Sequence, residues 1–86
     1  MTVRYLVEET HLLTGHGPAV MGLLQQGTIS TDETLQVAGT DSRVRIRSVE
    51  MHAVETEEGL RIGLLLHRED APSVTAGSVL VSPPEV

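Results

Sequence analysis

The chain has 86 residues, of which 40% are hydrophobic, and a formal net charge of −6 at pH 7. This length allows one domain with a modest core, and the absence of cysteine excludes disulfides, thiolate metal sites and cysteine nucleophiles. Every basic residue is an arginine, which excludes the lysine-dependent Walker A loop and Schiff-base catalysis, and the negative charge argues against non-specific nucleic-acid binding.

The first quarter of the chain predicts a long β-hairpin. A strand is expected over Val3–Thr14, a glycine-rich turn over Gly15–Pro18, and a return strand over Ala19–Gln25. Gly22 lies inside the return strand, where the missing side chain predicts a sharp bend or a close approach of another backbone. Gly27 ends the strand.

The middle of the chain predicts a second hairpin. Its strands are expected at Thr34–Ala38 and Arg43–Met51, joined by a loop at residues 39–42. In the second strand the apolar residues change parity near Arg47 and Ser48, which is typical of a β-bulge.

The last third of the chain predicts two further strands. Residues 52–60 are acidic and are expected to be irregular. A strand over Arg61–Leu66, a loop over His67–Gly77 and a short strand over Val79–Ser82 follow. Six or seven short strands without a convincing helix predict an all-β fold, either a sandwich or a small closed or nearly closed barrel. Closure is favoured because it leaves no exposed sheet edges.

Four stretches of the sequence resemble segments of a known family, and their order and spacing are those of that family. They are VEETHLLTGHGPAVMGLLQQGTI, SVEMHAV, EGLRIGLLLHR and VTAGSVLVSP. Together they resemble the second domain of elongation factor Tu and related translational GTPases, a β-barrel, over about Tyr5 to Pro83. The resemblance implies that residues 1–86 form one such barrel, here freestanding, because the GTPase domain and the third domain have no counterpart. Thr31-Asp32-Glu33 and Glu58-Gly59-Leu60 depart from the family pattern.

The resemblance also implies a binding site, because this domain of the factor helps to hold the aminoacylated 3′ end of tRNA. Glu8 and Glu9 match an acidic pair that lines the aminoacyl pocket, and His11 stands where the family has an aromatic residue. Glu50 matches a glutamate that contacts the terminal adenosine, and Arg61 replaces a family asparagine. An alternative is that these five residues are ordinary strand and surface positions.

Other polar groups give weaker signals. Arg43, Arg45 and Arg47 alternate along one strand, which suits either phosphate contact or a solvated sheet face. The histidines have no metal-site spacing, and the serines lie in no nucleophile elbow. We therefore expect no metal, no cofactor, no bound nucleotide and no enzymatic activity.

The expected function is that of a non-enzymatic binding module. Its partners would be the tRNA 3′ end or another RNA, a translation protein, or a separate GTPase chain. The alternative is a protein-interaction or oligomerisation module that keeps only the barrel. An RNA-binding module should gather its arginines, Arg61 included, on one face away from Glu55, Glu57 and Glu58. With no long apolar segment and charged residues near its start, the protein is expected in the cytoplasm, without membrane contact.

Overall fold

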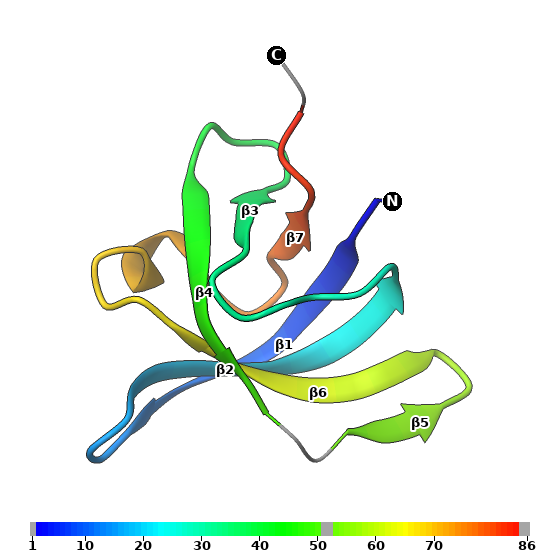
Figure 1. The fold of residues 1–86 in the computed structure, drawn as a ribbon, viewed down its shortest axis with the longest axis horizontal. Helices are drawn as coiled ribbons and strands as arrows, with labels where there is room; N and C mark the ends of the chain where they lie inside the picture. The colour runs from blue at the N-terminus through cyan, green and yellow to red at the C-terminus, as the bar shows by residue number, and fades with distance from the viewer. Residues whose placement is uncertain (1, 51–52, 85–86) are drawn as a thin grey trace.

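The structure is a computed structural model that describes residues 2–50 and 53–84, and its sheet contains seven antiparallel strands. The strands are β1 (Arg4–Leu13), β2 (Gly17–Gln26), β3 (Thr34–Val37), β4 (Arg43–Val49), β5 (Val54–Thr56), β6 (Gly59–Leu66) and β7 (Val79–Val81). Six of them close into a barrel in the order β2-β1-β7-β3-β4-β6, with β6 pairing back onto β2 (Figure 1). β5 is an extra strand on β6, and the predicted all-β barrel is confirmed.

The barrel is filled by aliphatic side chains that alternate along the strands. Val44 and Ile46 of β4 point inward and are fully buried, whereas the arginines that alternate with them, Arg43, Arg45 and Arg47, are exposed. Tyr5 is also fully buried, and its hydroxyl donates a hydrogen bond of 2.6 Å to the carbonyl oxygen of Ile62 on β6. The one aromatic side chain therefore links β1 to β6 across the interior.

Gly22 lies where the backbones of β1 and β2 approach each other closely. A Cβ atom at this position would collide with the carbonyl oxygen of Leu6 and come within 3.0 Å of the Tyr5 ring. The predicted close backbone approach is confirmed. The turn between the two strands contains Gly15 and Gly17, with φ of 82° and 88°, a region that favours glycine.

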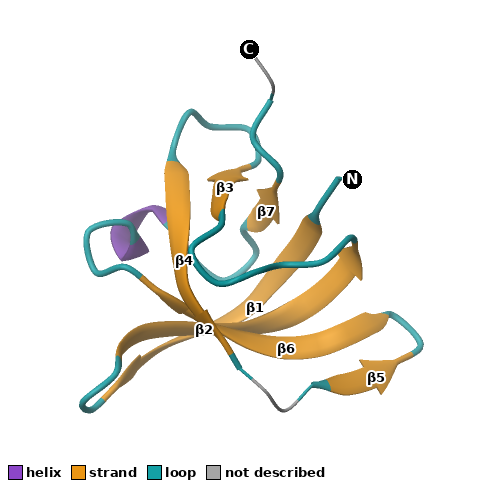
Figure 2. Ribbon diagram, in the orientation of Figure 1, coloured by secondary structure: helices purple, strands orange, loops and turns teal. Residues whose placement is uncertain are grey.

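Register shifts change the phase of the long strands, one of them between Arg4 and Tyr5 near the start of β1. The pairing of β4 with β6 shifts between Ile46 and Ser48, so the predicted bulge near Arg47 is confirmed. The pairing of β1 with β2 shifts between Val7 and Glu9, which leaves Glu8 unpaired. Beyond Glu8, β1 pairs only with β2, and the hairpin extends past the barrel (Figure 2).

The expectation that residues 52–60 are irregular was wrong for the described part. Val54–Thr56 forms β5, a tight turn follows, and β6 begins at Gly59, two residues before Arg61. The Thr56 hydroxyl donates a hydrogen bond of 2.7 Å to the carbonyl oxygen of Gly59 and closes this hairpin. All of β5 is exposed, so its sequence shows no apolar alternation that could have revealed it.

The other strand boundaries differ from expectation by one or two residues. β2 begins at Gly17 because the turn is tight enough for that residue to pair with Leu13. β4 ends at Val49, and Met51, the expected last residue, lies outside the described residues. The loop before β7 contains a single 3₁₀ turn at Ala71–Ser73. Within residues 2–50 and 53–84, no helix has the length and hydropathy needed to span a membrane.

Candidate functional site

A pocket of about 390 Å³ lies on the outer surface of the barrel, over β2 and β6. Its floor follows from the register of these two strands, which places Ala19 opposite Leu65 and Met21 opposite Gly63. Val20 and Leu64, at the alternate positions, are buried in the core. The floor is therefore mostly apolar, and the small residues in it make room for a ligand.

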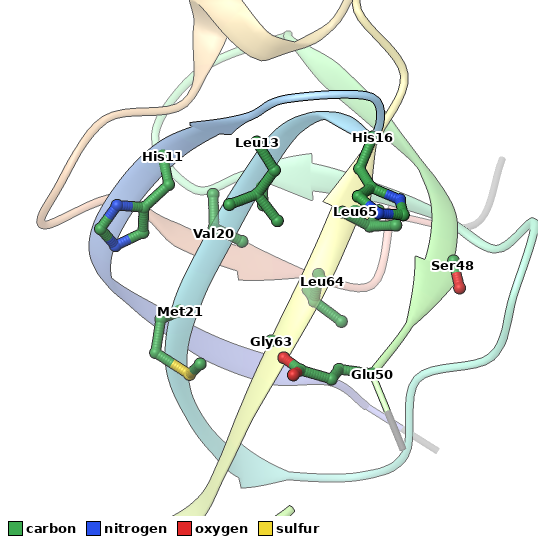
Figure 3. A pocket seen from close by; sticks show the side chains of 11 residues that line it. His11, Leu13, His16, Val20, Met21, Ser48, Glu50, Gly63, Leu64 and Leu65 are labelled. Atoms are coloured by element: carbon green, nitrogen blue, oxygen red, sulfur yellow. The ribbon is translucent and has the colours of Figure 1, made fainter. Parts of the chain in front are cut away.

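Polar side chains from three separate segments line the pocket. His11 comes from the projecting part of β1, His16 from the hairpin turn, and Ser48 and Glu50 from the end of β4 and just beyond it. In Figure 3, His11 and Glu50 lie on different sides of the pocket, with β2 and β6 between them. The arrangement offers two imidazoles, a hydroxyl and a carboxylate around an apolar floor.

The position of Glu50 depends on Gly63. The backbone N–H of Glu50, just after the chain leaves β4, donates a hydrogen bond of 2.9 Å to the carbonyl oxygen of Gly63 in the middle of β6. A Cβ atom on residue 63 would collide with Oε2 of Glu50. Gly63 thus lets the carboxylate lie against the strand at the edge of the pocket, where it can accept hydrogen bonds from a ligand.

Glu8 and Arg61 form an ion pair next to the pocket. Nη1 of Arg61 lies 3.2 Å from Oε1 of Glu8, the residue at the β1 bulge. Oε1 of Glu8 is buried and makes no hydrogen bond within the described residues, so the facing guanidinium is the charge that compensates it. The pair joins β1 to β6 across β2.

The same charges act on the buried phenol of Tyr5. Burial raises the pKa of Tyr5 well above its ordinary value, and the nearby carboxylate of Glu8 raises it further. Arg61 lowers this pKa and Glu50 raises it, and neither outweighs the effect of burial. Tyr5 is therefore a neutral hydrogen-bond donor at neutral pH and serves the fold, not the chemistry of the pocket.

Glu9 and His11 pair on the exposed part of β1. Nε2 of His11 lies 3.1 Å from Oε2 of Glu9, and about half of each side chain is exposed. The carboxylate restrains the imidazole at the rim of the pocket. A restrained ring of this kind can serve as a wall against which a flat ligand stacks.

The structure thus divides the five residues that the sequence singled out. His11 and Glu50 line the pocket, Glu9 contacts His11, and Glu8 and Arg61 pair outside the lining. Sequence reasoning missed the floor residues and assigned His16 only to the turn. The alternation of Ala19 and Met21 was a usable signal for one side of the floor, but the pairing of β2 with β6 was not visible in the sequence.

The arginines do not gather as expected of an RNA-binding module. Arg43, Arg45 and Arg47 lie exposed along β4. Arg61 instead pairs in register with Val54 of β5, beside the acidic hairpin, and its guanidinium contacts Glu8. The four arginines therefore do not share one face away from Glu55, because β5 forms next to Arg61, and this criterion for an RNA-binding module is not met.

A scan against models of known protein families finds no match to this sequence. Among the described residues, no group of three or more histidine and acidic side chains could hold a metal ion.

Proposed function

We propose that the protein is a non-enzymatic binding module whose pocket takes the terminal nucleoside of an RNA. This is the role implied by the resemblance to the second domain of elongation factor Tu. The observation that carries the proposal is that His11 and Glu50, 39 positions apart in the sequence, line one pocket with an apolar floor. A volume of about 390 Å³ is sufficient for a nucleoside.

The chemistry of the lining suits a base and a ribose. A base would lie on the floor formed by Met21 and Leu65, and the ring of His11 would stack against it. An ionised carboxylate only accepts hydrogen bonds, so Glu50 would receive them from the ribose hydroxyls. The 2′-hydroxyl distinguishes RNA from DNA, and the pocket is therefore expected to prefer a ribonucleoside end.

The remaining three residues have supporting roles in this proposal. Glu9 holds the His11 ring, and the Glu8–Arg61 pair fixes the bulge from which the projecting part of β1 begins. If the RNA end carries an amino acid, its α-ammonium group would find the carboxylates of Glu8 and Glu9 on the adjacent strand. Translation proteins and a separate GTPase chain remain the proposed protein partners, and no cofactor is needed.

The direct test is NMR chemical-shift mapping with an aminoacylated CCA-end mimic. Few charged contacts are available, so we expect a Kd between micromolar and millimolar, about −8 to −4 kcal/mol. Saturating shifts should appear at His11, Glu50 and Gly63, and a 2′,3′-dideoxy terminus should bind more weakly. Glu50→Ala should reduce binding, whereas the control Glu55→Ala, on the exposed β5, should leave it unchanged. Absence of shifts at millimolar ligand, or equal binding of the dideoxy form, would refute the proposal.

The second candidate is a protein-interaction or oligomerisation module, and two exposed apolar residues favour it. Leu12 on the projecting hairpin is 79% exposed, and Val54 on β5, which pairs with only one strand, is 60% exposed. Sedimentation velocity over a range of protein concentrations tests this candidate. Self-association that Leu12→Asn or Val54→Thr abolishes would favour it, and a concentration-independent monomer would count against oligomerisation.

A further inference from the structure

A second hollow of about 480 Å³ lies next to the pocket, at the hairpin turn. Leu13 and His16 line both, so the two hollows are contiguous. The second is lined further by the turn at residues 14–17 and by the side chains of Arg47 and Arg68. We call it the Arg47–Arg68 hollow.

Arg47 is held in place by the turn. Its Nη1 donates a hydrogen bond of 2.7 Å to the carbonyl oxygen of His16. A guanidinium has five N–H donors, and the others on Arg47 have no partner among residues 2–50 and 53–84. The side chain is therefore oriented by the protein while most of its donors stay available to a ligand.

Arg68 reaches the same hollow from the loop after β6. Within the part of the chain that the structure describes, its side chain makes no hydrogen bond and no ion pair. Neither Asp70 nor Glu69, the neighbouring acidic residues in the sequence, forms an ion pair with Arg68 among the described residues, and one oxygen of the Asp70 carboxylate accepts a hydrogen bond of 3.0 Å from the backbone N–H of Arg45. Arg68 thus adds a second cation without a bound anion.

The charge of this hollow contrasts with that of the whole protein. The chain has 12 acidic and six basic residues, yet two arginines and no acidic residue line the Arg47–Arg68 hollow. A concave site lined by cations alone focuses a positive potential, and planar guanidinium forks bind phosphate oxygens in pairs. An anion with several oxygens is the ligand that fits.

We propose that the Arg47–Arg68 hollow is a phosphate-binding site, which holds the 5′-phosphate of the nucleotide whose nucleoside lies in the pocket. The inference rests on the proposed function and adds to it, because it assigns the direction of the ligand. The terminal base and ribose lie over β2 and β6, and the chain continues past His16 towards the two arginines. The ligand class is then the nucleoside 5′-phosphate at the 3′ end of an RNA.

The experiment compares adenosine with adenosine 5′-monophosphate by NMR titration, and a CCA trinucleotide separates an RNA end from a free nucleotide. We expect the phosphate to tighten binding about tenfold, as charged hydrogen bonds commonly do. Because the hollow neutralises one phosphate, affinity for the trinucleotide should fall about two- to threefold as salt rises from about 50 to 200 mM. Equal binding of adenosine and its monophosphate would overturn the inference and leave the proposed function standing.

Variants locate the phosphate. Arg68→Gln breaks no hydrogen bond within the described residues and should remove much of the affinity that the phosphate adds. The double variant Arg47→Gln/Arg68→Gln should remove nearly all of this added affinity. Arg43→Gln is the matched control, with the same charge change on β4 and no place in the hollow. The amide spectrum without ligand checks that each variant folds. If the double variant still binds adenosine 5′-monophosphate about tenfold more tightly than adenosine, the phosphate site is refuted.

Inorganic pyrophosphate distinguishes failure of the phosphate site from failure of the nucleoside pocket. If adenosine does not bind but pyrophosphate moves the side-chain signals of Arg47 and Arg68, the phosphate site stands and the proposed nucleoside pocket falls. If pyrophosphate leaves those signals unmoved and the monophosphate gains nothing, the phosphate site falls.

Discussion

The two halves of β1 pair with the same strand but lie in different surroundings. The first half, up to Val7, is flanked by β2 on one side and by β7 on the other, and both Tyr5 and Val7 are fully buried. The second half, from Glu9 to Leu13, pairs only with β2 and is exposed throughout. The bulge at Glu8 separates them. The comparison teaches that one strand can stabilise the barrel with its first half and leave its second half free to form a pocket wall.

The largest loss of stability is expected from a substitution where the buried half of β1 meets β2. Gly22→Ala would place a Cβ atom against the carbonyl oxygen of Leu6, and a backbone atom cannot move aside as a flexible side chain can. We expect a loss of about 3 kcal/mol or more in the free energy of unfolding, measured by urea denaturation.

Gly15→Ala is the matched control in the exposed half of the hairpin. No atom lies within 4 Å of the added methyl group, so only the positive φ of 82° opposes it. We expect a loss of about 1–2 kcal/mol. If the two alanine variants unfold at the same urea concentration, the contrast between the halves of the hairpin is wrong.

A smaller effect is expected from Tyr5→Phe. The variant keeps the ring in the core but leaves the carbonyl oxygen of Ile62 without the donor that now lies 2.6 Å away. A buried acceptor without its donor costs about 1–3 kcal/mol. Urea denaturation at neutral pH measures the loss, and an unchanged midpoint would show that water replaces the hydroxyl.

The raised pKa of Tyr5 also predicts how stability depends on alkaline pH. In the unfolded chain the phenol loses its proton at about pH 10, whereas in the folded protein burial keeps it protonated. The unfolded state then binds fewer protons, so stability is full below about pH 10 and falls above it, by up to about 1.4 kcal/mol per pH unit. The chain has one tyrosine and no lysine or cysteine, so few other groups titrate there.

Two measurements check this alkaline loss. Urea midpoints should fall above about pH 10 in the wild-type protein and stay level in Tyr5→Phe, while both remain below the range where arginine loses its proton. Because Tyr5 is the one tyrosine in the chain, the absorbance of tyrosinate reports Tyr5 alone and should appear only as the protein unfolds. Ionisation in the folded state near pH 10 would contradict the burial argument.

The fold could be predicted further than the site because different interactions determine them. Alternation and turn residues are local, so the strands of the first hairpin and the bulge near Arg47 could be inferred from neighbouring positions. The pocket floor depends on which residue of β2 faces which residue of β6, as in the pair Met21 and Gly63, and that register is set by closure of the barrel. β5 escaped prediction because a strand exposed on both faces has no apolar pattern.

A modest effect is expected from the ion pair at the boundary between the halves of β1. Arg61→Gln removes the charge 3.2 Å from Glu8, and both side chains are partly exposed. Such a pair contributes about 0.2–1 kcal/mol because water screens it. A double-mutant cycle with Glu8→Gln measures the coupling. A coupling well above 1 kcal/mol would mean that the buried Oε1 of Glu8 depends on Arg61 more strongly than the exposure suggests.

The smallest effect is expected at Leu12, in the exposed half of β1. The side chain is 79% exposed, so Leu12→Asn gives up little buried apolar area and should change the free energy of unfolding by less than about 0.5 kcal/mol. Leu80→Ala on β7 is the contrasting variant, because Leu80 is fully buried beside the first half of β1 and its truncation should cost about 2–5 kcal/mol. Urea midpoints of the two variants measure the difference directly. A large loss from Leu12→Asn would mean that the projecting hairpin packs against something, most simply a second copy of the chain, and its dependence on protein concentration would then decide between the pocket and the oligomerisation module.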